Sequence, residues 1–207
     1  MDAPEDVRGA MDAPEETTTE RLRLDGADFV LRLTRRPSRL GLLALHGGVE
    51  GGTAELAEEV AARSGATCLT FTQPATPRVH ISSHLLAEAP SRTLETFVSA
   101  VSLTISLHGH LRPTAPDSIF LGGTNREAAE VLAAALRTLT PSFTAVTDLT
   151  EIPPGLRGLH PRNPVNLTRE GGVQVELPLT ARTRGLRDVP PEEVVAGVTE
   201  GVRRLGA

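Results

Sequence analysis

The chain has 207 residues, of which 39% are hydrophobic, and this length allows one well-buried domain. Its formal charge of −5 provides no polybasic surface, so we expect neither nucleic acid nor an anionic membrane as a partner. The sequence contains no apolar run of membrane-spanning length and no signal-peptide pattern, which predicts a cytoplasmic protein.

Lysine, tyrosine and tryptophan are absent, and all 21 basic residues are arginine. Acid-base or nucleophilic chemistry would therefore come from His, Asp, Glu, Arg, Ser, Thr or the single cysteine. Cys68, in the segment ATCLTF, has no partner for an intrachain disulfide and is expected to be a small core residue.

The first twenty residues are acidic, repeat the pentapeptide MDAPE and lack apolar periodicity. We therefore expect a disordered tail at 1–20 and a folded domain over 21–207. Apolar patterns predict strands at 29–35, 41–47, 67–71, 101–109, 118–123 and 173–179. Helices are predicted at 53–64, 92–100, 125–139 and 190–206. This alternation is typical of a single α/β domain with a mixed, mostly parallel sheet flanked by helices.

One histidine follows an apolar run and precedes two glycines. In GLLALHGG, His46 ends a predicted strand, and Gly47 permits a sharp turn. Ligands and catalytic groups gather at strand ends in α/β sheets. The turn would bring Glu50 back toward His46 as a second metal ligand. Glu55 would instead lie in the first turn of the next helix, where the helix dipole alone accounts for a carboxylate.

A second predicted strand has the same ending. In VSLTISLHGH, alternate residues from Ser102 to His108 share the more polar face, and Gly109 follows the histidine. His110, two residues later, is an alternative ligand. Two histidines, one carboxylate and an open position form the ligand set of a catalytic zinc site.

A zinc site of this kind still needs a general base. In GGVQVELPL, alternation places Gln174 and Glu176 on the face opposite the valines. A glutamate in an apolar strand is costly unless it is paired, protonated or placed at a polar cleft. Glu176 is therefore the candidate base, and an exposed sheet face is the alternative interpretation.

The same late region is rich in arginine, which binds carboxylates in a bidentate manner and would suit an acidic substrate. Solvated surface is the alternative explanation for any one of these side chains. Asn163 and Asn166 are either turn residues or amide donors that line a site. The arginines are Arg157, Arg162, Arg169, Arg182, Arg184 and Arg187.

Five segments occur in the order seen in the zinc-dependent poly-γ-glutamate hydrolases of phages and bacteria: LHGGVEGGTAELA, VHISS, SLHG, LGG and NPVNLTREGGVQVELPLTAR. The chain resembles this family from about Gly41 to Arg182. The family is similar to carboxypeptidase A in fold and site. The resemblance implies that His46, Glu50 and His108 bind Zn2+ and that Glu176 is the base that activates water.

The resemblance also implies substrate-binding residues. Arg169, Asn166 and Arg182 would bind substrate carboxylates or polarise the scissile carbonyl, and His80 and Ser83 in VHISS would lie nearby. The family usually reads HGGGIE where this chain reads HGGVE, which has one residue fewer between the histidine and the glutamate. Glu55 is therefore kept as the substitute ligand for the case that the shorter loop holds Glu50 away from the metal.

Together these features predict a zinc-dependent amidohydrolase or peptidase that cleaves γ-glutamyl amide bonds, with an anionic glutamyl polymer or peptide as its partner. One alternative is an amidohydrolase for N-acyl or N-formyl amino acids. Another is a non-catalytic, anion-binding or structural relative with a degenerate metal site. We expect a monomer, and release by lysis if a phage encodes the protein.

Overall fold

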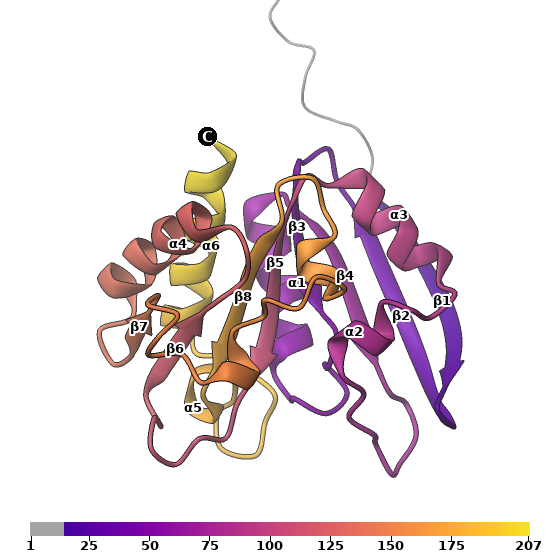
Figure 1. Cartoon of the computed structure of the whole chain (residues 1–207), viewed down its shortest axis with the longest axis horizontal. Helices are drawn as coiled ribbons and strands as arrows, with labels where there is room; N and C mark the ends of the chain where they lie inside the picture. Colours follow the sequence, from indigo (N-terminus) through magenta and orange to yellow (C-terminus); the bar gives the residue numbers. More distant parts are fainter. Residues whose placement is uncertain (1–14) are drawn as a thin grey trace, which may run out of the picture.

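Within residues 15–207, which the computed structural model describes, eight strands form one mixed sheet in the order β1-β2-β4-β3-β5-β8-β6-β7 (Figure 1). Pairing is parallel from β4 through β3 and β5 to β8, and between β6 and β7. It is antiparallel for β1–β2, β2–β4 and β6–β8. The strands are β1 (Glu16–Leu24), β2 (Ala27–Arg35), β3 (Leu40–Ala44), β4 (Thr67–Thr72), β5 (Leu103–Gly109), β6 (Ser118–Leu121), β7 (Thr144–Val146) and β8 (Gly172–Leu177).

Helices cover both faces of the sheet and divide the core into two clusters. The larger cluster lies between the central strands and α1, α4 and α6, and the smaller one between β2, β4 and the segment that contains α2 and α3. Figure 1 shows α4 and α6 side by side, with α3 over β1 and β2 at the other end of the sheet. No helix in the described part of the chain combines the length and apolarity needed to cross a membrane. The helices are α1 (Thr53–Ser64), α2 (Ser83–Leu86), α3 (Arg92–Ala100), α4 (Arg126–Leu139), α5 (Leu179–Arg182) and α6 (Glu192–Gly206), with 3-10 turns η1 (Pro154–Leu156) and η2 (Pro164–Asn166).

Strands β5 and β8 bring polar side chains to the centre of the sheet. Ile105 and Val175 point into the larger core cluster with the helices. Because side chains alternate along a strand, His108 and Glu176 point to the opposite face. That face is also covered, since η2 packs against both strands and both polar side chains are buried. The predicted α/β architecture with a mixed, mostly parallel sheet is confirmed.

The disordered tail predicted at 1–20 is too long at its C-terminal end. Strand β1 begins at Glu16, so residues 16–20 belong to the sheet, paired over their length with β2. Most β1 side chains are exposed, so this edge strand carries little of the apolar alternation that reveals a buried one. The first fourteen residues of the predicted tail lie outside the described residues.

Candidate active site

Three side chains expected to bind a metal converge at the ends of two neighbouring strands. His46 follows β3, Glu50 lies in the next turn, and His108 is near the end of β5. One ligand atom from each residue lies within 4.8 Å of the others. The Nδ1 atom of His46 is 3.2 Å from Nδ1 of His108 and 3.1 Å from Oε1 of Glu50. Both histidines are buried, so this arrangement is a compact candidate metal site.

The short spacing of HGGVE is explained by a single tight turn. The backbone N–H of Glu50 donates to the carbonyl of His46 at 2.7 Å. Residues four apart on such a turn project to the same side. Gly52 then begins α1 with φ of +86°, a left-handed conformation that favours glycine. HGGVE is one residue shorter than the HGGGIE that is usual in the family, but this difference does not keep Glu50 away from His46.

The two alternative ligands lie elsewhere. Glu55 is exposed in the first turn of α1 and is not part of the cluster. His110 donates from Nε2 to the carbonyl of Ser118 at 2.9 Å, and its ring packs against Phe120. The structure thus brings Glu50, rather than Glu55 or His110, to the two histidines.

The second ring nitrogen of each clustered histidine is also bonded, and this decides where the lone pairs lie. Nε2 of His46 donates to the carbonyl of Ile81 at 2.9 Å, which leaves the lone pair of the neutral ring on Nδ1. Nε2 of His108 lies 2.9 Å from the hydroxyl of Ser106. Such partners fix the orientation of metal-binding histidines.

The donor atoms suit a divalent cation. Burial lowers the pKa of His108, which disfavours a proton between the two rings. Burial also raises the pKa of Glu50, but hydrogen bonds with His108, His46 and His80 outweigh it and hold that pKa well below its usual range. The Gly109 N–H donates to Oε2 of Glu50 at 2.9 Å. Two imidazole nitrogens and one ionised carboxylate fit zinc with a position left open for a further ligand.

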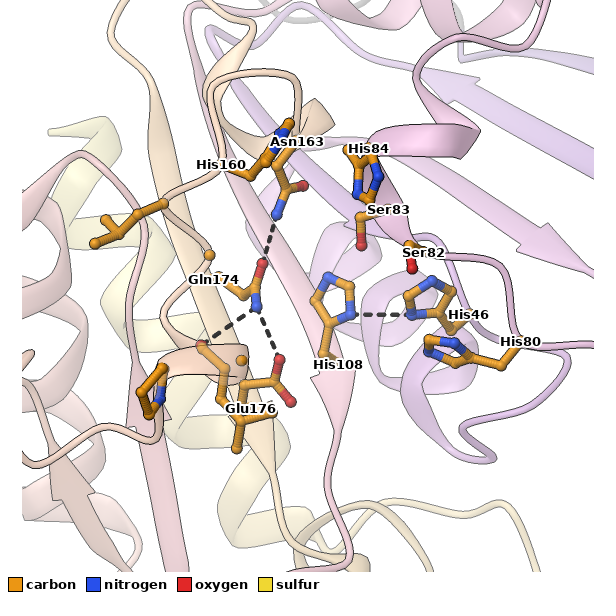
Figure 2. Close-up of a pocket in the computed structure, with 15 residues that line it drawn as sticks. His46, His80, Ser82, Ser83, His84, His108, His160, Asn163, Gln174 and Glu176 are labelled. Atoms are coloured by element: carbon orange, nitrogen blue, oxygen red, sulfur yellow. Dashed lines mark hydrogen bonds between the residues drawn. The ribbon is translucent and has the colours of Figure 1, made fainter.

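The candidate base lies on the adjacent strand. Glu176 is the register partner of His108 and is only 4% exposed. Gln174 donates from Nε2 to Oε1 of Glu176 at 2.8 Å, and Asn163 donates to Gln174 at 2.8 Å (Figure 2). Burial and the charge of Glu50 raise the pKa of Glu176 to about 8. A buried carboxyl with a raised pKa at a cavity is a candidate proton acceptor, so the exposed-face interpretation does not hold.

A cavity of about 390 Å3 opens onto these groups, a size typical of small-ligand sites. His80 and Ser83, both expected near the substrate, line it, and His80 packs against His46 with ring centroids 4.4 Å apart. In Figure 2, Gln174 and Glu176 lie on one side of the histidine cluster and Ser82 and Ser83 on another. Sequence reasoning did not single out several lining residues, because no periodic pattern marks these positions in loops and short helical turns; they are Ser82, His84, Leu156, Leu159 and His160.

Two residues expected at the substrate lie outside this cavity lining. The amide of Asn166 donates to the carbonyls of Gly158 and His160 and accepts from Thr124, so it braces a loop. The side chain of Arg169 is 81% exposed and precedes the start of β8, whereas the candidate base lies near the end of that strand.

Arg182 is close to the site but does not line the cavity. It is 4% exposed, and its Nη1 donates to the carbonyl of Gly51 at 2.5 Å. Its guanidinium packs on Gly109, where an added Cβ would lie 2.4 Å from Nε. Within the described residues, this buried Nε has no hydrogen-bond partner. Arg182 therefore lies behind the turn that carries Glu50.

The fold and the site together define a class of protein. A metallo-carboxypeptidase from Burkholderia cenocepacia aligns with a TM-score of 0.54 at 10% identity, over 94% of this chain and 65% of that chain. The chain thus has the fold of the carboxypeptidase-like hydrolases, with a His-Glu-His cluster that could hold a metal ion.

The sequence profile of the poly-gamma-glutamate hydrolases matches residues 17–191, so the chain belongs to that family, as the motifs predicted. A bacteriophage poly-gamma-glutamate hydrolase is 20% identical, with a TM-score of 0.69 over 88% of this chain and 89% of that chain. YndL, in a zinc-free apo form, is 25% identical, with a TM-score of 0.69 over 85% of this chain and 88% of that chain. No curated protein matches the chain.

Proposed function

We propose that this hydrolase is a zinc-dependent enzyme that cleaves γ-glutamyl amide bonds in poly-γ-glutamate or related γ-glutamyl peptides. The observation that carries the proposal is the position of Glu176 beside His108, on the cavity that His46 and His108 also line; Glu50 completes their cluster. Membership of the poly-γ-glutamate hydrolase family supports the substrate class.

In this proposal His46 and His108 bind zinc through Nδ1, and Glu50 binds it through its carboxylate. Support comes from the donor set, since both Nε2 atoms are hydrogen-bonded and Glu50 is ionised. Zinc at this position would polarise a carbonyl and lower the pKa of water.

Glu176 acts as the general base. It takes a proton from the attacking water and transfers it to the departing amine. Gln174 binds Oε1, which orients the carboxyl and leaves Oε2 available. A zinc ion bound at the neighbouring cluster would favour the ionised form that accepts a proton, against the effect of burial and of Glu50.

His80 and Ser83 contact the substrate in this proposal, because both line the cavity. The hydrogen bond with Glu50 raises the pKa of His80, which favours an imidazolium beside an acidic substrate. The proposal assigns no substrate contact to Asn166, Arg169 or Arg182, because none of them lines the cavity.

The test is cleavage of poly-γ-glutamate by zinc-loaded protein, followed by product size and by release of new amines. Glu176→Gln should lose about 100-fold to 10,000-fold in turnover, the range for a general base, while zinc content stays at the parent level. Glu95→Gln, which changes an exposed glutamate on α3, is the matched control.

Each other outcome has a definite meaning. Parent-level turnover by Glu176→Gln would overturn the assignment of the base. Cleavage of N-formylglutamate without cleavage of the polymer would move the function to small N-acyl amino acids. A folded, zinc-replete protein that cleaves neither substrate would be a binding or structural relative.

A further inference from the structure

A γ-linked glutamate polymer carries one free α-carboxylate on each residue, and an enzyme that binds it needs donors for those groups. Among the described residues, no arginine lines the cavity. Arg162 is paired with Glu88, and Arg157 donates from Nε to the carbonyl of Ile152. The donors inside the cavity must therefore be of another kind.

Two histidines that belong neither to the metal cluster nor to the base lie on the cavity, one on each of two walls. His84 is on α2, and His160 lies between η1 and η2. Their ring centroids are 4.7 Å apart, with the planes tilted by 32° (Figure 2). Segments far apart in the sequence thus present two imidazoles at one place.

The nitrogens of this pair are available to a ligand. Nδ1 of His160 accepts from the backbone N–H of Arg162 at 3.2 Å, which puts the proton of the neutral ring on Nε2. Within residues 15–207, neither Nε2 of His160 nor the ring of His84 is hydrogen-bonded to the protein. Glu88, four residues after His84, is paired with Arg162.

Neutral donors lie beside the pair. Ser82 and Ser83 line the same cavity, and Figure 2 shows both between His84 and His46. Imidazole N–H groups with adjacent hydroxyls suit a carboxylate, because an ionised acceptor forms the stronger, charge-assisted hydrogen bonds.

We propose that His84 and His160 form a carboxylate-binding subsite, which takes the α-carboxylate of a γ-linked glutamyl unit next to the bond that is cleaved. The proposal rests on the function proposed above and names the part of the cavity that selects an acidic substrate. It assigns this selection to imidazoles in place of the arginines that the sequence indicated.

The test compares γ-linked tetraglutamate with the same oligomer carrying α-carboxamides. In His84→Ala/His160→Ala, KM for the carboxylate oligomer should rise about tenfold, as expected for lost hydrogen bonds to a charged group. The kcat on both oligomers and KM for the carboxamide should stay within about twofold of the parent. The single substitution His160→Arg replaces the imidazole donor with a guanidinium donor. It should keep the parent KM for the carboxylate oligomer. Arg21→Ala removes an exposed positive charge on β1 and is the control.

Equal changes in KM for the two oligomers, or no change in either, would overturn the subsite. A failure of the proposed function gives a different result, because the parent protein would then cleave neither oligomer. In that case calorimetry on the zinc-loaded Glu176→Gln protein decides. Weaker binding of tetraglutamate by about tenfold after the double substitution supports the subsite, and equal binding overturns it.

Discussion

His108 and Glu176 are direct register partners on the adjacent parallel strands β5 and β8. The residues two positions earlier, Ser106 and Gln174, are also register partners, and each hydrogen-bonds the functional side chain on its own strand. The backbone ladder of the sheet therefore fixes the spacing between a candidate metal ligand and the candidate base. Their polar neighbours fix the two orientations.

The first prediction concerns the carboxylate ligand. Glu50→Gln should weaken zinc binding by more than about 100-fold. Loss of a residue that only hydrogen-bonds a metal ligand weakens binding by up to about 100-fold, and loss of the ligand itself should weaken it further. Glu55→Gln should leave the affinity unchanged, because Glu55 is exposed on α1 and apart from the cluster. Competition with a zinc chelator measures both variants. The reverse result would make Glu55 the ligand.

The second prediction concerns pH and the stability of the zinc-free protein. The pKa of Glu176 is raised from 4.5 to about 8 by burial and by Glu50, so the folded state holds a proton that the unfolded state releases. The free energy of unfolding should thus fall between about pH 4.5 and about pH 8, by at most about 1.4 kcal/mol per pH unit for this group. Glu176→Gln should flatten the profile in urea titrations, whereas Glu95→Gln should keep the parent slope. An unchanged slope in Glu176→Gln would contradict the raised pKa.

The third prediction separates two roles for Arg182. Because its guanidinium binds the Gly51 carbonyl and packs on Gly109, Arg182→Met should disturb the turn that carries Glu50. We expect zinc affinity to fall about 10-fold to 100-fold while the protein stays folded. Arg184→Met, at an exposed position, is the control. A change confined to KM, with parent zinc affinity, would instead make Arg182 a substrate residue.

The fourth prediction uses the two glycines at the ends of α1. Both have positive φ, but only Gly52 is crowded, since an added Cβ would lie 1.7 Å from the carbonyl oxygen of Arg182. Gly65→Ala should cost about 1 kcal/mol of stability from backbone strain alone. Gly52→Ala should cost about 1–3 kcal/mol more and reduce zinc affinity, because the following shift displaces Glu50. Equal losses in thermal or chemical unfolding would show that the close approach has no energetic consequence.

The buried parts of the fold could be predicted from the sequence. Helix α4 and strand β8 carry strong periodicity because one side of each packs in the larger core cluster. Strand β1 was missed because its side chains face water, and β7, α2 and α5 are too short to show a period.

The same distinction holds in the site. His46 and His108 could be identified because each follows an apolar run and precedes glycine. The cavity walls depend on tertiary contacts that no local pattern records. Gln73, for example, makes two hydrogen bonds to the backbone of Val79 and so folds back the loop that presents His80. Nothing in the neighbouring sequence of His84 or His160 indicates that the two rings meet.

The covering of the polar sheet face by loops has a practical consequence for engineering. The candidate ligand His108 and the candidate base Glu176 belong to the ladder of β5 and β8, whereas the segments 73–91 and 147–171 are mostly connections between elements. Connections tolerate insertion and exchange far better than central strands do. Loops from other proteins, exchanged into these two segments, should therefore change the choice of substrate. The positions of His108 and Glu176 on the central strands should stay the same.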